Sequence, residues 1–252
     1  MISRTRGTVP IYINNRNWLT WPRAMARYFD DVPGTQVIIV DNASTYPPLL
    51  DWYESDCPYP VVRLDNNLGP HAPWGCGAIL PPRIHCAYFS TPYYVLTDPD
   101  LELDSCPKDL ILRLIEGYER YPDVTKVGLS LEIDDLPEDS LTAKTVIPWE
   151  RNFWERKRDG QFFDASVDTT FAVYDVRVPC KGICLRSDHP YTARHLPWYL
   201  TRDNMSDEHI QYLSSATGGC WSVMLRRLIE TNTSPAAGAA PAKGESGVAA
   251  VG

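Results

Sequence analysis

The stretch YYVLTDPDL, residues 93–101, combines a predicted buried strand with two carboxylates. Tyr93 to Thr97 is an apolar run rich in aromatic and β-branched residues, which favours a β-strand. Asp98-Pro99-Asp100 follows at once, so the two carboxylates stand on the turn behind the strand. A hard divalent cation is usually held by one or two carboxylates together with substrate phosphates. Since a solvated surface turn can also contain Asp-x-Asp, the weight of this motif depends on its neighbours.

Three earlier apolar runs end in the same way. Val9–Ile13, Gln36–Val40 and Val61–Leu64 are predicted strands. The polar segments that follow them are Asn14-Asn15-Arg16, Asp41-Asn42 and Asp65-Asn66-Asn67. Ligands of open α/β sheets bind at the carboxyl ends of the strands, so we expect these side chains to converge with the two carboxylates at one site.

Helical patterns alternate with these strands. Trp18 to Phe29 and Pro107 to Tyr121 are predicted helices, and Val124 to Ile133 is a further predicted strand. The alternation is typical of βαβ units, so the predicted fold class is α/β, with a mostly parallel central sheet flanked by helices.

The second half of the chain is less regular. We expect a helical turn over residues 149–154, short strands over 170–174 and 176–178, and a loop over 189–199. Residues 231–252 are rich in Ala, Gly, Pro and Ser and have almost no large apolar side chain, which predicts a disordered tail.

Composition excludes several classes. The chain has 252 residues, of which 44% are apolar and 22% are charged, as in folded soluble domains. The net charge of -8 predicts no binding to nucleic acid. No membrane-spanning run or signal peptide is recognisable, so we expect a cytoplasmic protein, with peripheral association at the inner face of a membrane left open. The seven cysteines lack zinc-site spacing, which favours reduced structural thiols.

Four motifs, in this order, resemble those of the GT-A glycosyltransferases, particularly the family 2 type. They are VPIYINNR (residues 9–16), VIIVDNAS (37–44), NLGP (67–70) and DPD (98–100). The resemblance extends from about Val9 to Leu131. It implies a GT-A (Rossmann-like) fold, a nucleotide-sugar donor with a UDP-sugar as the first expectation, and a divalent cation, Mn²⁺ or Mg²⁺.

The resemblance also implies roles for individual residues. Asp41 would contact the base or ribose, while Asp98 and Asp100 would position the ribose or sugar and the metal bound to the diphosphate. The full set expected to bind the donor is Asn15, Arg16, Asp41, Asn67, Gly69 and Asp98. His195 would be a third metal ligand, with Arg194 beside it contacting the diphosphate and His189 as the competing histidine.

The general base is less well marked. Asp168 is the first candidate, Asp134-Asp135 the second and Asp207-Glu208 the third. The acceptor-binding half also contains five aromatic residues that could contact a sugar ring or belong to the core, namely Trp149, Phe153, Trp154, Trp198 and Tyr199. Glu150-Arg151 is interpreted as solvated helix charge.

The predicted function is therefore that of a metal-dependent glycosyltransferase of the hexosyltransferase type. Its acceptor would be a saccharide or glycolipid, in polysaccharide or glycolipid assembly. We expect one domain over residues 1–230, with a nucleotide-sugar-binding half over about 1–131 and an acceptor-binding half over about 132–230. The alternatives are a non-catalytic nucleotide- or carbohydrate-binding module and a sugar-phosphate nucleotidyltransferase. The latter is disfavoured because Asn14-Asn15-Arg16-Asn17 stands where its Gly-rich loop would be.

Overall fold

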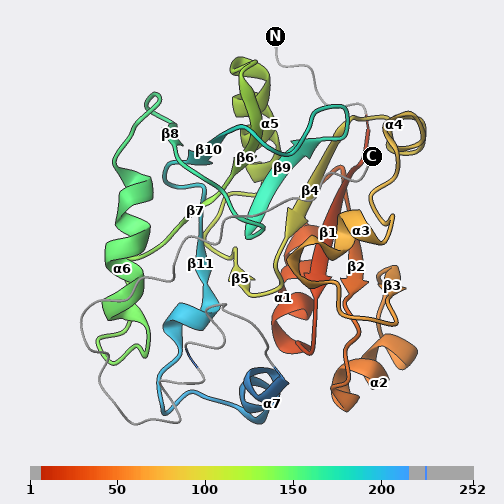
Figure 1. The fold of residues 1–252 in the computed structure, drawn as a ribbon, viewed down its shortest axis with the longest axis vertical. Coiled ribbons are helices and arrows are strands. Elements are labelled where there is room, and N and C mark those ends of the chain that lie inside the picture. The colour runs from red at the N-terminus through yellow and green to blue at the C-terminus, as the bar shows by residue number, and fades with distance from the viewer. Residues whose placement is uncertain (1–6, 216–224, 226–252) are drawn as a thin grey trace.

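The computed structural model describes residues 7–215 and Leu225, which contain eleven strands and seven α-helices (Figure 1). The strands are β1 Val9–Asn15, β2 Thr35–Asp41, β3 Val61–Arg63, β4 Tyr93–Thr97, β5 Leu101–Glu102, β6 Val124–Gly128, β7 Ser130–Leu131, β8 Phe162–Asp164, β9 Phe171–Asp175, β10 Ile183–Ser187 and β11 Thr192–His195. The α-helices are α1 Thr20–Asp30, α2 Pro47–Ser55, α3 Ala72–Gly75, α4 Pro82–Phe89, α5 Leu110–Arg120, α6 Ala143–Arg151 and α7 Asp207–Ser215. Three short 3-10 helices are η1 Gly69–His71, η2 Asn152–Trp154 and η3 Leu196–Tyr199.

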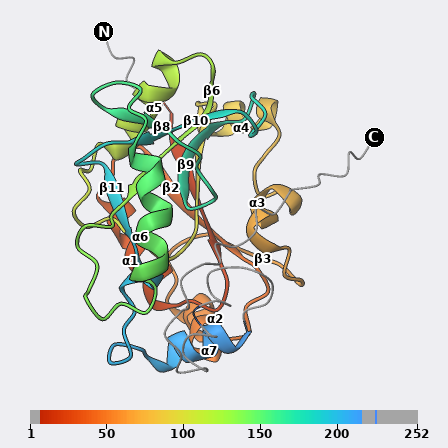
Figure 2. The same cartoon turned by 60° about the vertical axis from the view of Figure 1, so that its left-hand side comes forward.

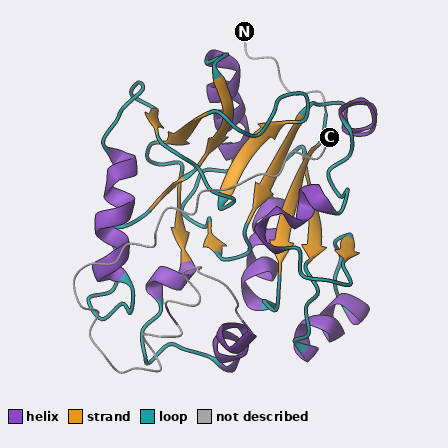
Figure 3. Ribbon diagram, viewed as in Figure 1, coloured by secondary structure: helices purple, strands orange, loops and turns teal. Residues whose placement is uncertain are grey.

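The main sheet has the strand order β3-β2-β1-β4-β9-β6-β10-β8. Its first four strands are mutually parallel, β9 runs antiparallel to both β4 and β6, β10 is parallel to β6, and β8 is antiparallel to β10. The α/β class and the large sheet flanked by helices are thus confirmed (Figure 3). Since the parallel strands share one direction, their carboxyl ends meet at one edge of the sheet.

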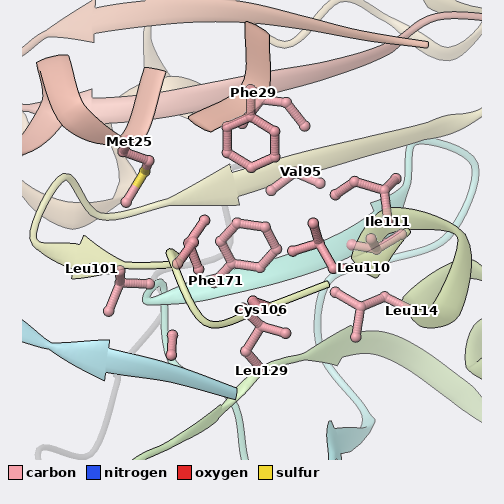
Figure 4. Close-up of a cluster of buried hydrophobic side chains, with 14 of the residues drawn as sticks. Met25, Phe29, Val95, Leu101, Cys106, Leu110, Ile111, Leu114, Leu129 and Phe171 are labelled. Carbon is pink, nitrogen blue, oxygen red and sulfur yellow. The ribbon is translucent and has the colours of Figure 1, made fainter. Parts of the chain in front are cut away.

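Alternating side chains of the central strands build two apolar layers. On β4, Val95 packs in one cluster and Tyr94 in the other, as the two-residue period of a strand requires. Helices α1 and α5 cover the first layer, where the Phe29 and Phe171 rings stack with their centroids 6.2 Å apart (Figure 4). The second layer is covered by the α3 region, including Trp74.

A second sheet, of order β5-β11-β7, joins the two halves of the chain. β11 pairs with β5, directly behind the Asp98-Pro99-Asp100 turn, through the partners His195 and Leu101. Its other edge pairs in parallel with β7. This small sheet brings residues of the second half to the carboxyl end of the parallel strands, and α7 lies at the same end of the molecule as α2 (Figures 1 and 2).

Several local predictions were wrong where tertiary contacts decide the structure. The strand expected over 124–133 is divided at Leu129 into β6 and β7, which belong to different sheets. Residues 176–178 form a turn, and the loop expected over 189–199 contains β11 and η3, because β11 forms by pairing with distant segments. The tail expected over 231–252 lies outside the described residues. Among those described, no helix is both long and apolar enough to span a membrane.

Candidate functional site

A cleft of about 370 Å³ opens at the carboxyl end of the parallel strands. It receives side chains from the ends of β1 and β4, from the segment that follows β3, and from the second half of the chain. The structure brings seven of the predicted site residues to its walls: Arg16, Asn67, Gly69, Asp98, Asp100, Asp168 and His195. The two others, Asn15 and Asp41, do not line it.

Three aspartates crowd together at the end of β4. The Asp98 amide donates to the Thr170 carbonyl over 3.1 Å, and the Thr169 hydroxyl donates to Asp98 Oδ2 over 3.2 Å, so the β4 turn is tied to the segment of Asp168. Burial, with the charges of Asp100 and Asp168, raises the pKa of Asp98 well above its usual value. One oxygen of Asp100, Oδ1, is buried without a hydrogen-bond partner. The three carboxylates therefore lie close together, and Asp100 Oδ1 has no hydrogen-bond donor to offset its negative charge.

His195 completes the group from β11. The Leu196 amide donates to the Asp100 carbonyl over 2.8 Å, which fixes the end of β11 against the Asp-x-Asp turn. His195 Nε2 lies 3.5 Å from Asp100 Oδ2, while Nδ1 is buried without a hydrogen-bond partner. Burial lowers the pKa of His195, although Asp100 and Asp168 act in the opposite direction. Burial of His195 thus favours the neutral imidazole, which is the form that ligates metals.

Asp98, Asp100 and His195 offer carboxylate oxygens and an imidazole nitrogen, which are suitable ligands for a divalent cation such as Mn²⁺. Mutually repelling carboxylates and the unpartnered Asp100 Oδ1 are what a cation would relieve. Within the described part of the chain, however, no three His, Cys, Asp or Glu side chains form a ready metal-binding group. The arrangement thus fits an ion that is held partly by substrate phosphates, which needs fewer protein ligands.

One wall of the cleft is the loop of residues 67–69, which is held in place by hydrogen bonds with asparagine side chains. Asn42 accepts from the Leu68 amide over 2.7 Å and donates to the Gly69 carbonyl over 2.9 Å. The Gly69 amide donates to Asn67 Oδ1 over 2.9 Å, and Gly69 has a φ of 73°, which favours glycine. Asn14 and Asn42 also line the cleft. Neither was among the residues predicted to bind the donor, although both follow predicted strands, and that position is the signal that could have identified them.

Asn15 and Asp41 are buried and do not line the cleft. Asn15 is fully buried and donates to the Trp18 carbonyl over 2.8 Å and to the Tyr53 hydroxyl over 2.9 Å. Asp41, 1% exposed, accepts from the Ser44 amide over 3.1 Å. Their contacts order the turns after β1 and β2. Arg16, between them in the chain, does reach the cleft, and its Nε is buried without a hydrogen-bond partner.

The competing acidic residues have structural partners elsewhere. Asp135 accepts from Arg194 Nε over 2.6 Å and from the Tyr199 hydroxyl over 2.5 Å. Partial burial acts to raise the pKa of Asp135, but these hydrogen bonds and the Arg194 charge outweigh it and hold the pKa below its usual value. Glu208 caps the N-terminus of α1, accepting from the Thr20 amide over 2.9 Å. Of the three candidate bases, only Asp168 lines the cleft.

The expected contact of Arg194 with a diphosphate is not what the structure shows. Arg194 pairs with Glu102 over 2.7 Å and with Asp135, away from the cleft lining. His189 is also absent from the lining and stacks on Trp154, with ring centroids 5.0 Å apart. Arg194 thus links β11 to Glu102 and Asp135, and His189 packs the segment before β11 against Trp154.

The aromatic residues expected near the acceptor do not line the cleft. Their places are taken by Trp18 and Tyr212, which sequence reasoning missed because no local pattern links two residues so far apart. The interpretation of Glu150 as solvated was also wrong. It is 2% exposed and pairs with Arg186, which is 5% exposed, so this ion pair belongs to the interior.

Asp98→Asn is expected to stabilise the protein in the absence of divalent cations, because it removes one of the crowded carboxylates. Because the pKa of Asp98 is raised in the folded state, the folded protein binds more protons than the unfolded chain between about pH 4 and that raised pKa. Over this range, the contribution of Asp98 to the free energy of unfolding falls as the pH rises. The gain in unfolding free energy, measured with urea in EDTA, should therefore be larger at about pH 8 than at about pH 5. An equal gain at both pH values, or the same gain from Asp134→Asn on an exposed residue, would contradict this account.

No family model matches the sequence, and no curated protein does either. Among solved structures, the chain is similar to a mannosyltransferase from Pyrobaculum calidifontis in complex with GDP-Man and Mn²⁺, with a TM-score of 0.51 and 13% identity. The match covers 92% of this chain and 66% of the mannosyltransferase. This chain has the GT-A fold. It spans about two thirds of the length of that enzyme.

Two further likenesses are weaker. Glucosyl-3-phosphoglycerate synthase from Mycobacterium tuberculosis, in complex with Mn²⁺ and UDP, matches 68% of this chain and 58% of its own, at a TM-score of 0.37 and 11% identity. A 4-diphosphocytidyl-2C-methyl-D-erythritol synthase matches 82% of this chain and 98% of its own, at a TM-score of 0.40 and 11% identity. Of these three structures the mannosyltransferase alone exceeds 0.5, so the GT-A assignment rests on it. Within that fold, Asp98, Asp100 and His195 border the cleft at the edge of the sheet where ligands usually bind.

Proposed function

We propose that this protein is a metal-dependent glycosyltransferase of the hexosyltransferase type, which transfers a sugar from a nucleoside-diphosphate donor to a hydroxyl acceptor. One observation carries the proposal: on a GT-A fold, the Asp98-Pro99-Asp100 turn, His195 and Asp168 meet in one cleft. These residues come from three separate segments of the chain, and only the folded arrangement makes them a site.

The donor would lie along the wall formed by Asn67 and Gly69, with Arg16 supplying a positive charge for the diphosphate. Asp98, Asp100 and His195 would hold Mn²⁺ or Mg²⁺. When bound, the cation would act as a Lewis acid that neutralises the charge developing on the departing diphosphate. A UDP-sugar is the donor that we would test first.

Asp168 would act as the general base. Its side chain is exposed in the cleft, and one of its oxygens accepts from the Thr169 amide over 2.9 Å, which orients the carboxylate. The carboxylate would take the proton of the acceptor hydroxyl as the acceptor oxygen bonds to the sugar carbon and the diphosphate leaves with the electrons of the broken bond. We propose a saccharide or glycolipid acceptor, in polysaccharide or glycolipid assembly, and a cytoplasmic protein.

Calorimetric titration with UDP, GDP, CDP and ADP, with Mn²⁺ or with EDTA, tests the proposal. We expect one nucleotide to bind in the presence of Mn²⁺, and Asp100→Ala to weaken that binding by more than about tenfold. The control is Asp104→Ala, which removes an exposed carboxylate four residues further along, outside the cleft lining.

Two other results would change the assignment. If no nucleotide binds in the presence of Mn²⁺, or if EDTA and Asp100→Ala leave binding unchanged, the proposed function is wrong. If a nucleotide binds in a metal-dependent way but no sugar donor is cleaved to release it, the protein would instead be the non-catalytic binding module.

A further inference from the structure

Another wall of the cleft is used by neither the proposed donor-binding residues nor the proposed metal ligands. It is formed by Trp18, Pro197, Tyr212 and Ser215. Trp18 precedes α1, Pro197 lies in η3, and the two other residues belong to α7. This wall borders the same cleft as the carboxylates, since Asp168 and Tyr212 both line that cleft.

The aromatic side chains of this wall form a stack. The Trp18 ring packs on Trp21 with centroids 3.9 Å apart and an interplanar angle of 26°, and on Tyr212 with centroids 4.3 Å apart and an angle of 33°. The His209 ring stands edge-on to both tryptophans. Trp18 is only 3% exposed, whereas Tyr212 is half-buried and borders the cleft.

Helix α7 is anchored at both ends. At its first turn, Glu208 is 8% exposed and accepts hydrogen bonds from the Thr20 amide over 2.9 Å and the Thr20 hydroxyl over 2.6 Å. At its last residue, Ser215 Oγ accepts from the fully buried Asn17 over 3.1 Å. The position of Tyr212 is therefore set before any ligand arrives, which lowers the entropic cost of stacking a ligand on it.

We propose that Tyr212 is the platform on which a sugar ring of the acceptor stacks. An aromatic face packs well on the apolar C–H face of a pyranose, whereas the hydroxyls at the ring edge remain available for other contacts. A ring placed there would lie in the same cleft as Asp168, the proposed base, while the Asn67–Gly69 wall is left to the donor. This inference rests on the proposed function, and it names the residue on which the saccharide acceptor would stack.

Saturation-transfer NMR on the full chain tests the platform. The probes are the methyl α- and β-glycosides of glucose, galactose, mannose and N-acetylglucosamine, each with the nucleoside diphosphate that binds in the calorimetric titration and with Mg²⁺, because paramagnetic Mn²⁺ would broaden the ligand signals. We expect at least one glycoside to bind, with the strongest transfer to the C–H protons of one ring face. Tyr212→Ala and Tyr212→Leu should weaken this binding by about tenfold, whereas Tyr212→Phe should retain it.

Tyr88→Ala is the matched control, because Tyr88 is 70% exposed on α4, outside the cleft lining. Nucleotide affinity should be the same in all four variants. The leucine variant keeps an apolar side chain behind the site, so it reports on the ring even where the alanine variant fails to fold.

The platform is wrong if nucleotide binds normally but no glycoside does, or if Tyr212→Leu binds the glycoside as well as the wild type. These results differ from a failure of the proposed function, in which the nucleotide itself does not bind in the presence of Mn²⁺.

Discussion

Asp168→Asn is expected to slow sugar transfer by about 10²- to 10⁴-fold, the usual contribution of a general base. An amide cannot take the acceptor's proton, although it keeps the size of the side chain and can still accept from the Thr169 amide. Nucleotide affinity should change far less, because Asp168 is not among the proposed metal ligands. The rate is measured as release of nucleoside diphosphate in single turnover, with the glycoside identified by NMR and with sugar donors of the nucleotide identified by calorimetry.

The control is Asp134→Asn. Asp134 belonged to the second candidate pair for the base, is exposed, and does not line the cleft. Its replacement should leave the rate unchanged. If Asp134→Asn loses the activity and Asp168→Asn keeps it, the base has been misassigned, while the donor site would stand.

Arg186→Met is expected to lower the free energy of unfolding by about 3–5 kcal/mol, because it leaves the buried Glu150 carboxylate without its counter-charge. Arg186 Nε also donates to the Ser166 carbonyl over 2.7 Å, two residues before Asp168, and its guanidinium lies over the Phe153 ring. The variant should therefore also slow transfer, because the segment that carries the base loses an anchor. Urea unfolding gives the stability change.

The double variant Glu150→Leu/Arg186→Met should recover most of the lost stability, since apolar side chains can replace a buried ion pair at little cost. For comparison, Lys157→Met removes the cation of the Lys157–Asp188 pair, in which the lysine is 60% exposed, and should cost at most about 1 kcal/mol. A loss from Arg186→Met no larger than that would contradict the assignment of the pair to the interior.

The parallel half of the fold could be predicted because it leaves a local signal. Strands β1, β2 and β4 lie inside the sheet, so each contains an apolar run, and polar residues follow each run. Because ligands bind at such strand ends, the positions of Asp98 and Asp100 behind β4 were enough to predict a site there. By contrast, β11 is four residues long and pairs with segments far away in the chain, so its local sequence resembled a loop.

Charged side chains were the hardest to interpret, because their roles depend on partners distant in the sequence. Glu150 is matched by Arg186, and Arg194 is occupied by Glu102 and Asp135. Nothing near any of these residues in the sequence distinguishes a buried pair from a solvated surface charge, since the energy that separates them comes from burial and from a partner that folding supplies.

The sequence by itself determined the α/β alternation and the carboxylates at the end of β4, because periodicity and the boundary between strand and turn are properties of neighbouring residues. Only the tertiary structure decided that Asp168 faces the cleft while Glu208 caps α1, and that Tyr212 rather than Trp154 borders the site. These outcomes depend on how the second half packs against the first. Such packing is set by the burial of many side chains together, which no short segment of sequence encodes.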